Sequence, residues 1–126
     1  MPEIINTEDA PAAIGPYSQA VKAGKTLFIS GQLPINPKTG QIESVGIVDQ
    51  THQSLNNLKA IITKAGLDLN NVVKVGVFIS DMNDFSTINE VYEKFFENIY
   101  PARFVVEVSR LPKDALIEID AIVVDE

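Results

Sequence analysis

The segment Pro101–Asp120, with the sequence PARFVVEVSRLPKDALIEID, constrains the fold more than any other part of the chain. It contains two β-branched runs joined by a turn at Leu111–Asp114, and the alternation along each run predicts two strands. The alternation points Arg103 and Val105 to one face of the first strand, and Glu118 to a mixed face of the second. We expect these side chains to share a sheet surface that is too apolar for water and too charged for a plain core, which indicates a polar ligand.

Arginine and glutamate on such a surface suggest a specific chemistry. The guanidinium of Arg103 can hold a carboxylate through two parallel hydrogen bonds, and Glu118 can orient or deprotonate a water molecule. The pair therefore suits the hydrolysis of a small acid. The competing interpretation is an ion pair at a protein interface, and the spacing of the two residues alone favours that alternative.

Length and composition indicate a single domain over residues 1–126. The chain is 45% hydrophobic with a mean hydropathy of +0.09, which is enough to bury one core. Its 10 basic and 17 acidic residues give a net charge of −7. This balance disfavours nucleic acid as a partner, because affinity for phosphates comes mainly from lysine and arginine.

Several site types and compartments are excluded or disfavoured by residue usage. The absence of cysteine excludes disulfides and thiolate ligands, and the single histidine, His52, cannot form a protein-only zinc site and is expected on the surface. Residues 1–6 lack the basic and apolar regions of a signal peptide, and no apolar run approaches the roughly 18 residues of a membrane span. We expect a cytoplasmic protein that contacts no membrane.

Residue types along the rest of the chain predict further strands. We expect strands at residues 17–23 and 25–32, around a turn at Gly24-Lys25, and a buried strand at residues 72–80. Residues 34–40, which contain two prolines and a Thr-Gly turn, are predicted to form a loop.

Two helices are predicted between these strands. Apolar residues recur at helical spacing from Val48 to Ala65, and Gly66 provides a stop. Asn83 or Asp84 is expected to cap the second helix, which ends near Tyr100-Pro101. Its apolar stripe is predicted to consist of Phe85, Ile88, Tyr92, Phe95 and Ile99.

The resulting β-β-α-β-α-β-β order predicts an α+β domain with two helices on one face of a mixed sheet. The other sheet face, which we expect to carry Val105, Leu116 and Ile122, then needs a partner. A second copy of the chain is the simplest one. A closed oligomer would bury this face and place Arg103 and Glu118 in clefts between subunits.

Short motifs that follow one another over nearly the whole chain resemble the Rid family, formerly called YjgF-like. They are Gly15-Pro16-Tyr17-Ser18-Gln19-Ala20, Ile29-Ser30-Gly31-Gln32, Asn57-Leu58, Asn89-Glu90-Val91-Tyr92, Pro101-Ala102-Arg103 and Leu111-Pro112-Lys113. The resemblance implies a chorismate-mutase-like homotrimer that hydrolyses 2-aminoacrylate, 2-iminobutanoate and 2-iminopropanoate to 2-keto acids and ammonia. It implies no metal or organic cofactor. The substrates would come from pyridoxal-phosphate (PLP) enzymes such as threonine or serine dehydratase.

The resemblance also implies roles for single residues. Arg103 corresponds to the arginine that grips the substrate carboxylate, and Glu118 to the acid that holds the attacking water. Tyr17 lies where the family places a phenol over the pocket. Gly31 lies where a backbone amide helps the arginine to bind the carboxylate.

Further residues are implied to line the cleft. Ser30 and Asn89 are expected in its wall, and the main-chain carbonyl of Val105 corresponds to an acceptor for the imine nitrogen, which favours the protonated iminium. The chain departs from the commoner family pattern at Phe104 and Val105, where many relatives have small residues. The role of a main-chain carbonyl survives this change, but pocket volume and substrate preference do not follow from the resemblance.

Without the resemblance, these residues have structural interpretations. Tyr17 would be an aromatic after a Gly-Pro turn, Gly31 a bulge or strand-end glycine, and Asn89 a solvated or capping amide. Three function classes therefore remain. They are an enamine and imine deaminase, a protein that binds small carboxylates such as 2-keto acids without turnover, and an RNA-directed activity. The net charge of −7 and the lack of paired histidines make the last the weakest.

Overall fold

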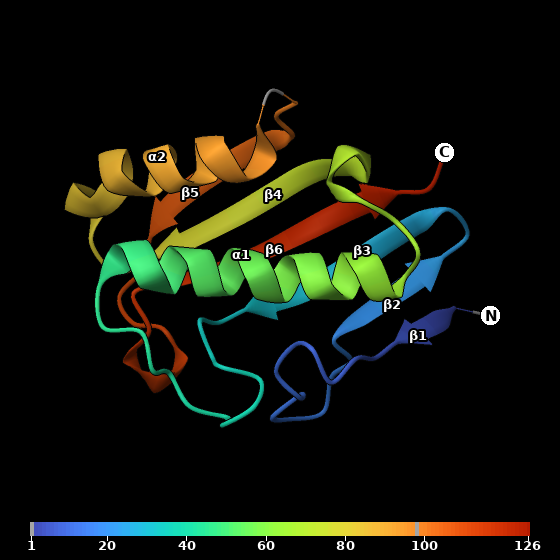
Figure 1. Ribbon diagram of the computed structural model, residues 1–126, viewed down its shortest axis with the longest axis horizontal. Helices are drawn as coiled ribbons and strands as arrows, with labels where there is room; N and C mark the ends of the chain where they lie inside the picture. The colour runs from blue at the N-terminus through green and yellow to red at the C-terminus, as the bar shows by residue number, and fades with distance from the viewer. Residues whose placement is uncertain (1, 98) are drawn as a thin grey trace.

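Six strands and two α-helices follow one another in the computed structural model, which describes residues 2–97 and 99–126. The strands are β1 (Glu3–Ile5), β2 (Ala20–Ala23), β3 (Thr26–Gln32), β4 (Val72–Ile79), β5 (Ala102–Glu107) and β6 (Ile117–Val124). The helices are α1 (Ile47–Lys64) and α2 (Phe85–Phe96), and both lie on the same face of the sheet (Figure 1). The predicted α+β class with two helices on one face is confirmed. Within the described residues, neither helix is both long and apolar enough to cross a membrane.

The sheet is mixed, with the strand order β1-β2-β3-β6-β4-β5. Only β4 and β5 run parallel, and the other neighbours are antiparallel. β6 lies between β3 and β4, and its side chains alternate between buried and half-buried. The buried ones are at most 3% exposed and are Ile117, Ile119, Ala121 and Val123. They pack in the core beneath the helices, on what we call the inner face of the sheet; the face that neither helix covers is the open face.

The first helix and the turns agree closely with the sequence. α1 spans Ile47–Lys64, and Gly66, with φ of +80°, follows its end. Gly24 also has a positive φ of +61° in the predicted hairpin turn between β2 and β3. The predicted loop at residues 34–40 is confirmed, and His52 is exposed as expected.

Other element boundaries differ from the prediction. β1 was not predicted, because a three-residue run is too short to show a period. The second helix ends at Phe96, since Glu97 has φ of +61°, and Ile99 is 59% exposed instead of joining the apolar stripe. Asp84 occupies the N-cap position of α2, as predicted, but its side chain accepts no capping hydrogen bond. Asp81 instead accepts a hydrogen bond from the amide of Asn83 and caps a short 3-10 turn before the helix.

The prediction that Arg103 and Val105 share a sheet face with Glu118 is wrong. β4 lies between β5 and β6, so the two closing strands are not neighbours. Val75 pairs with Arg103 on one side and with Ala121 on the other, which places Arg103 on the inner face. Glu118 is three residues from Ala121 and points to the open face. The length of the segment between β5 and β6 does not determine which side chains of the two strands share a face. That relation is set by the register that each strand adopts with β4.

Two buried amides of α1 attach irregular segments to the core. Asn57 is 1% exposed, and its Nδ2 donates to the carbonyls of Leu33 at 3.0 Å and Ile35 at 2.9 Å. The Oε1 of Gln50 accepts a hydrogen bond of 2.8 Å from the amide of Leu116, at the start of β6. These side chains satisfy main-chain groups that have no strand partner of their own.

Replacing Asn57 by alanine is expected to leave the Leu33 and Ile35 carbonyls buried without a donor. We expect Asn57→Ala to lower the free energy of unfolding by about 2–3 kcal/mol. The exposed neighbour Asn56 gives a matched control, and Asn56→Ala should change this free energy by no more than about 0.5 kcal/mol. Urea denaturation at one fixed protein concentration measures both variants. Equal losses in the two variants would contradict the assigned role of Asn57.

Candidate functional site

The predicted site residues fall into two groups on opposite faces of the sheet. Arg103 and Asn89 form the first group with the aromatic residues of α2, and we call it the arginine half-site. Glu118, Gly31 and Tyr17 form the second group, which we call the glutamate half-site. The structure brings together the members of each half-site but does not bring the two half-sites together within one chain.

Helix α2 holds the guanidinium of Arg103 in the arginine half-site. The Nη1 of Arg103 donates a hydrogen bond of 2.9 Å to Oδ1 of Asn89. The guanidinium carbon also lies 4.7 Å from the ring centroid of Tyr92 and 5.8 Å from that of Phe85, within the range of cation–π attraction. Asn89 is therefore a partner of Arg103 and not a solvated amide. Three fixed contacts orient a side chain that otherwise has many rotamers.

A cavity of about 400 Å³ opens beside this guanidinium. Its lining consists of Asn89, Tyr92, Glu93, Tyr100, Pro101 and Arg103. A guanidinium has five N–H donors in a planar fork, so Arg103 can bind a carboxylate while keeping its bond to Asn89. The half-site is thus suited to a small anion.

Tyr92 was predicted only to pack in the helix interface, and its contact with Arg103 was missed. It lies three residues after Asn89 on α2, and that spacing puts both side chains on one side of a helix. Burial raises the pKa of Tyr92 to about 12, although the charge of Arg103 acts in the opposite direction. The ring therefore stays a neutral phenol against the guanidinium.

A bulge in β3 shapes the glutamate half-site. The register between β3 and β6 shifts between Ile29 and Gln32, so Ser30 and Gly31 form the bulge. A Cβ at position 31 would lie 2.8 Å from Cδ of Glu118, so the carboxyl group occupies space that only a glycine leaves free. The structural interpretation of Gly31 as a bulge glycine is confirmed, and the bulge also brings it against Glu118.

Glu118 is half-buried on the open face of β6. Burial raises the pKa of its carboxyl group, and the negative charge of Asp120 raises it further. A carboxylate with a raised proton affinity is a better general base near neutral pH than an exposed one.

Tyr17, the third member of the glutamate half-site, lies in the loop before β2. The residue is 48% exposed, and its hydroxyl accepts a hydrogen bond of 3.3 Å from the amide of Ile14. Together with Gly31, it lines a cavity of about 20 Å³. The loop is held by Gln19, which is 2% exposed and whose structural role was not predicted. Its Nε2 donates to the carbonyls of three loop residues, Thr7, Ala10 and Pro11.

The side chains of Ser30 and Val105 make structural contacts near the half-sites and do not line the cavity beside Arg103. The hydroxyl of Ser30 donates a hydrogen bond of 2.6 Å to the carbonyl of Ser18, which ties the loop of Tyr17 to β3. The side chain of Val105 packs against the core. Its strand, β5, is the edge of the sheet, so part of its main chain faces away from β4.

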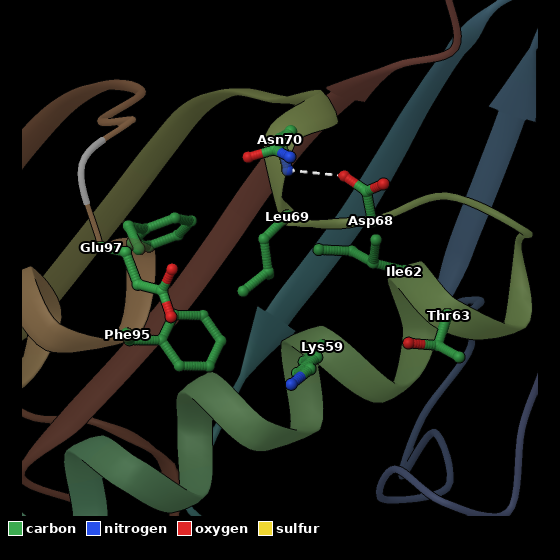
Figure 2. Close-up of a pocket in the computed structure, with 9 residues that line it drawn as sticks. Lys59, Ile62, Thr63, Asp68, Leu69, Asn70, Phe95 and Glu97 are labelled. Atoms are coloured by element: carbon green, nitrogen blue, oxygen red, sulfur yellow. Dashed lines mark hydrogen bonds between the residues drawn. The ribbon is translucent and has the colours of Figure 1, made fainter.

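A second region has the shape of a binding site but none of the predicted residues. A cavity of about 330 Å³ lies between the C-terminal parts of α1 and α2 (Figure 2). Its apolar wall includes Leu69 and Phe95, and its charged residues Lys59, Asp68 and Glu97 are exposed. No group of three or more potential metal-binding side chains gathers anywhere in residues 2–97 and 99–126.

Comparisons with known proteins agree on one family. The family model described as endoribonuclease L-PSP matches residues 7–125. A RutC family protein from Pyrococcus horikoshii is 60% identical over 126 residues, with 100% of both chains covered. The 2-iminobutanoate/2-iminopropanoate deaminase of Escherichia coli is 52% identical over 127 residues, with 98% of both chains covered.

A solved structure has the same fold. Escherichia coli TdcF with bound serine matches with a TM-score of 0.95 and 50% identity, covering 98% of this chain and 99% of that chain. The fold that the sequence resemblance implied is therefore confirmed.

The hydroxyl of Tyr92 is buried and has no hydrogen-bond partner among residues 2–97 and 99–126. Tyr92→Phe keeps the ring beside Arg103 and removes the unsatisfied hydroxyl, so the free energy of unfolding should stay unchanged or rise by up to about 1 kcal/mol. Tyr92→Leu also removes the cation–π contact and should lower it by about 1–2 kcal/mol. Urea denaturation distinguishes the two variants. A phenylalanine variant as unstable as the leucine variant would show that the hydroxyl has a partner.

Proposed function

Because the chain belongs to the Rid family, the YjgF and endoribonuclease L-PSP group, we propose that it is a hydrolytic deaminase of reactive enamines and imines. The substrates would be 2-aminoacrylate, 2-iminobutanoate and 2-iminopropanoate, and the products 2-keto acids and ammonia. PLP-dependent threonine and serine dehydratases would supply them. The single observation that carries the proposal is that the chain presents a guanidinium fixed at Arg103 on one face of the sheet and a half-buried carboxyl group at Glu118 on the other.

Substrate binding rests on Arg103. All proposed substrates carry a carboxylate next to the reacting carbon, and a guanidinium fixed by Asn89 and Tyr92 loses little further freedom when it binds that group. The amide of Gly31 would add a hydrogen bond to the same carboxylate. The related TdcF was solved with bound serine, which supports a ligand of the size and charge of a small amino acid.

The two half-sites require an assembly. Side chains on opposite faces of a sheet point in opposite directions, so one small acid cannot contact Arg103 and Glu118 of the same chain. We infer that the arginine half-site of one subunit lies against the glutamate half-site of the next, in a homotrimer that closes as a ring. The open face supports this inference, because Phe28, Phe104 and Val106 are 49%, 39% and 40% exposed there.

The chemistry would proceed by addition of water to an iminium. The carbonyl of Val105 accepts a hydrogen bond from the imine nitrogen and favours the protonated form, whose carbon is the better electrophile. Glu118 takes a proton from water as the oxygen attacks this carbon, which gives a tetrahedral intermediate. The proton then passes to the nitrogen. As the carbon–nitrogen bond breaks and ammonia departs, Glu118 takes the hydroxyl proton and releases it to solvent, so that a 2-keto acid remains. An enamine first takes a proton on its terminal carbon to become the imine.

The pH dependence follows from the raised pKa of Glu118. Only its deprotonated form can accept the proton from water, so activity falls as the pH drops through that pKa. Burial and the Asp120 charge raise this pKa and move the loss to higher pH than for an ordinary carboxyl group, whereas the Arg103 guanidinium of the next subunit would act in the opposite direction.

Two alternatives use the same observations differently. A binding protein that senses a small carboxylate would need the arginine half-site but not a base, and the raised pKa of Glu118 favours the enzyme. An RNA-directed activity would need cationic surface, which a chain with a net charge of −7 has little of.

The first test is a trapping competition. A PLP-dependent dehydratase generates 2-aminoacrylate or 2-iminobutanoate, semicarbazide captures it, and the protein competes by hydrolysis. We expect kcat/KM to fall about 100-fold in Arg103→Ala, which loses the carboxylate anchor, and kcat to fall about 100-fold in Glu118→Gln, which loses the base. Arg110→Ala, at an exposed arginine paired with Asp114, is the matched control and should keep wild-type rates.

Wild-type turnover in Arg103→Ala would contradict the assigned binding site. Tight binding of a 2-keto acid without any hydrolysis by the wild-type protein would favour the non-catalytic alternative.

The assembly is tested on the open face. Phe28→Asp places a charge on the surface that we expect between subunits, so sedimentation should shift from trimer to monomer and deaminase activity should be lost together. Val48→Asp makes the same kind of change at a residue that is 43% exposed on α1, and should leave the trimer intact. A fully active wild-type monomer would rule out a site between subunits.

A further inference from the structure

Two carboxylates of β6 each occupy the space above a glycine of a neighbouring strand. Glu118 lies against Gly31 of β3 on one side. Asp120 lies against Gly76 of β4 on the other side, and its Oδ1 accepts a hydrogen bond of 3.0 Å from the Gly76 amide. A Cβ on Gly76 would overlap Oδ1 of Asp120 and lie 2.7 Å from Cζ of Phe104. Without a side chain at position 76, the Asp120 carboxylate can reach the main chain of β4.

The two carboxylates are neighbours on the open face. They are two residues apart on one strand, so their Cα atoms are about 6.6 Å apart and their side chains point the same way. In the register between β3 and β6, the bulge that brings Gly31 against Glu118 lies opposite Asp120. The position of Asp120 is therefore part of the geometry that forms the glutamate half-site.

Asp120 has contacts that favour its ionised form. Burial has the largest effect on Asp120 and raises its pKa above the ordinary value, and the hydrogen bond from Gly76 and the positive charge of Lys74 offset only part of that increase. Lys74 itself lies 5.6 Å from the centroid of the Phe104 ring. For Glu118, burial and the charge of Asp120 both raise the pKa. Of the two acids, only Asp120 has neighbours, the Gly76 amide and Lys74, that stabilise its negative charge.

The remaining groups around Glu118 complete this environment. β4 presents Lys74 and Phe78 to the open face, and β5 presents Phe104, whose ring meets that of Phe78 edge to face at 5.4 Å. Tyr17 lines the small cavity beside Gly31. The aromatic rings keep water from part of the surface, and charges interact more strongly where water is excluded.

We propose that Asp120 is a positioning residue for the reaction: held on Gly76, it fixes a negative charge beside Glu118 and makes Glu118 a stronger proton acceptor. Asp120 acts through Glu118 and touches no reacting atom. The catalytic part of this inference rests on the deaminase function proposed above, whereas the coupling between the two carboxyl groups does not.

The test measures the titration of Glu118 directly. The protein is labelled with ¹³C at glutamate side-chain carboxyls, and the Glu118 resonance is assigned by its loss in Glu118→Gln. We expect Asp120→Asn, which keeps the size of the side chain and an acceptor for Gly76, to move the Glu118 midpoint to lower pH. Asp49→Asn makes the same change in net charge on α1, on the inner side of the sheet, and should leave the midpoint unchanged.

A second variant guards against a local packing change. Asp120→Ser also removes the charge and retains an oxygen acceptor, and it should shift the midpoint in the same direction. Unchanged midpoints in both Asp120 variants would overturn the proposal.

The catalytic consequence is read from the pH profile of kcat/KM. In Asp120→Asn the acid limb should move to lower pH with the carboxyl midpoint, so that below the wild-type midpoint the variant keeps several-fold more of its plateau rate. A shifted carboxyl midpoint with an unshifted acid limb would overturn the role of Asp120 in the reaction. If the wild-type protein hydrolyses no imine at all, the proposed function fails, and the carboxyl titration still decides whether Asp120 acts on Glu118.

Discussion

Much of the structure depends on β6, the last strand of the chain, lying between β3 and β4. Its inward side chains, Ile117 to Val123, complete the core beneath the helices, and its outward side chains include Glu118 and Asp120. A shift of one residue in its register would turn the acids into the core and the isoleucines to the open face. The free energy of burying the core therefore also keeps the two carboxyl groups in place.

The sheet separates the chemical groups that a small substrate would need together. Arg103 lies on the inner face at the edge strand, where α2 orients it, and Glu118 lies on the open face near the centre. For the proposed reaction, a single subunit would therefore hold only part of the site, and this is the chemical reason for the association that we propose. The exposed Phe28 and Phe104 give the open face an apolar surface, which supports the association that we propose.

The candidate site residues are held by contacts that leave them few alternative positions. Arg103 is fixed by one hydrogen bond and two aromatic rings, while Glu118 and Asp120 occupy the space above two glycines. The buried amides of Gln19 and Asn57 hold the loops around them. Each of these devices limits motion before a ligand arrives, which reduces the entropy lost on binding.

Sequence by itself was sufficient for α1, β3, β4 and the two closing strands, because period and turn residues act over a few positions. The bulge at Gly31 was also indicated, since a glycine in a strand suggests a bulge or a close approach, but the contact of Gly31 with Glu118 came only from the structure. The local sequence pattern could not show that Asn89 and Tyr92 contact the guanidinium of Arg103. Nor could it show that the absence of a side chain at Gly76 leaves space for the Asp120 carboxylate. Only the tertiary structure decided that Arg103 and Glu118 face opposite ways, because the phase between β5 and β6 is set by the hydrogen bonds that each makes to β4.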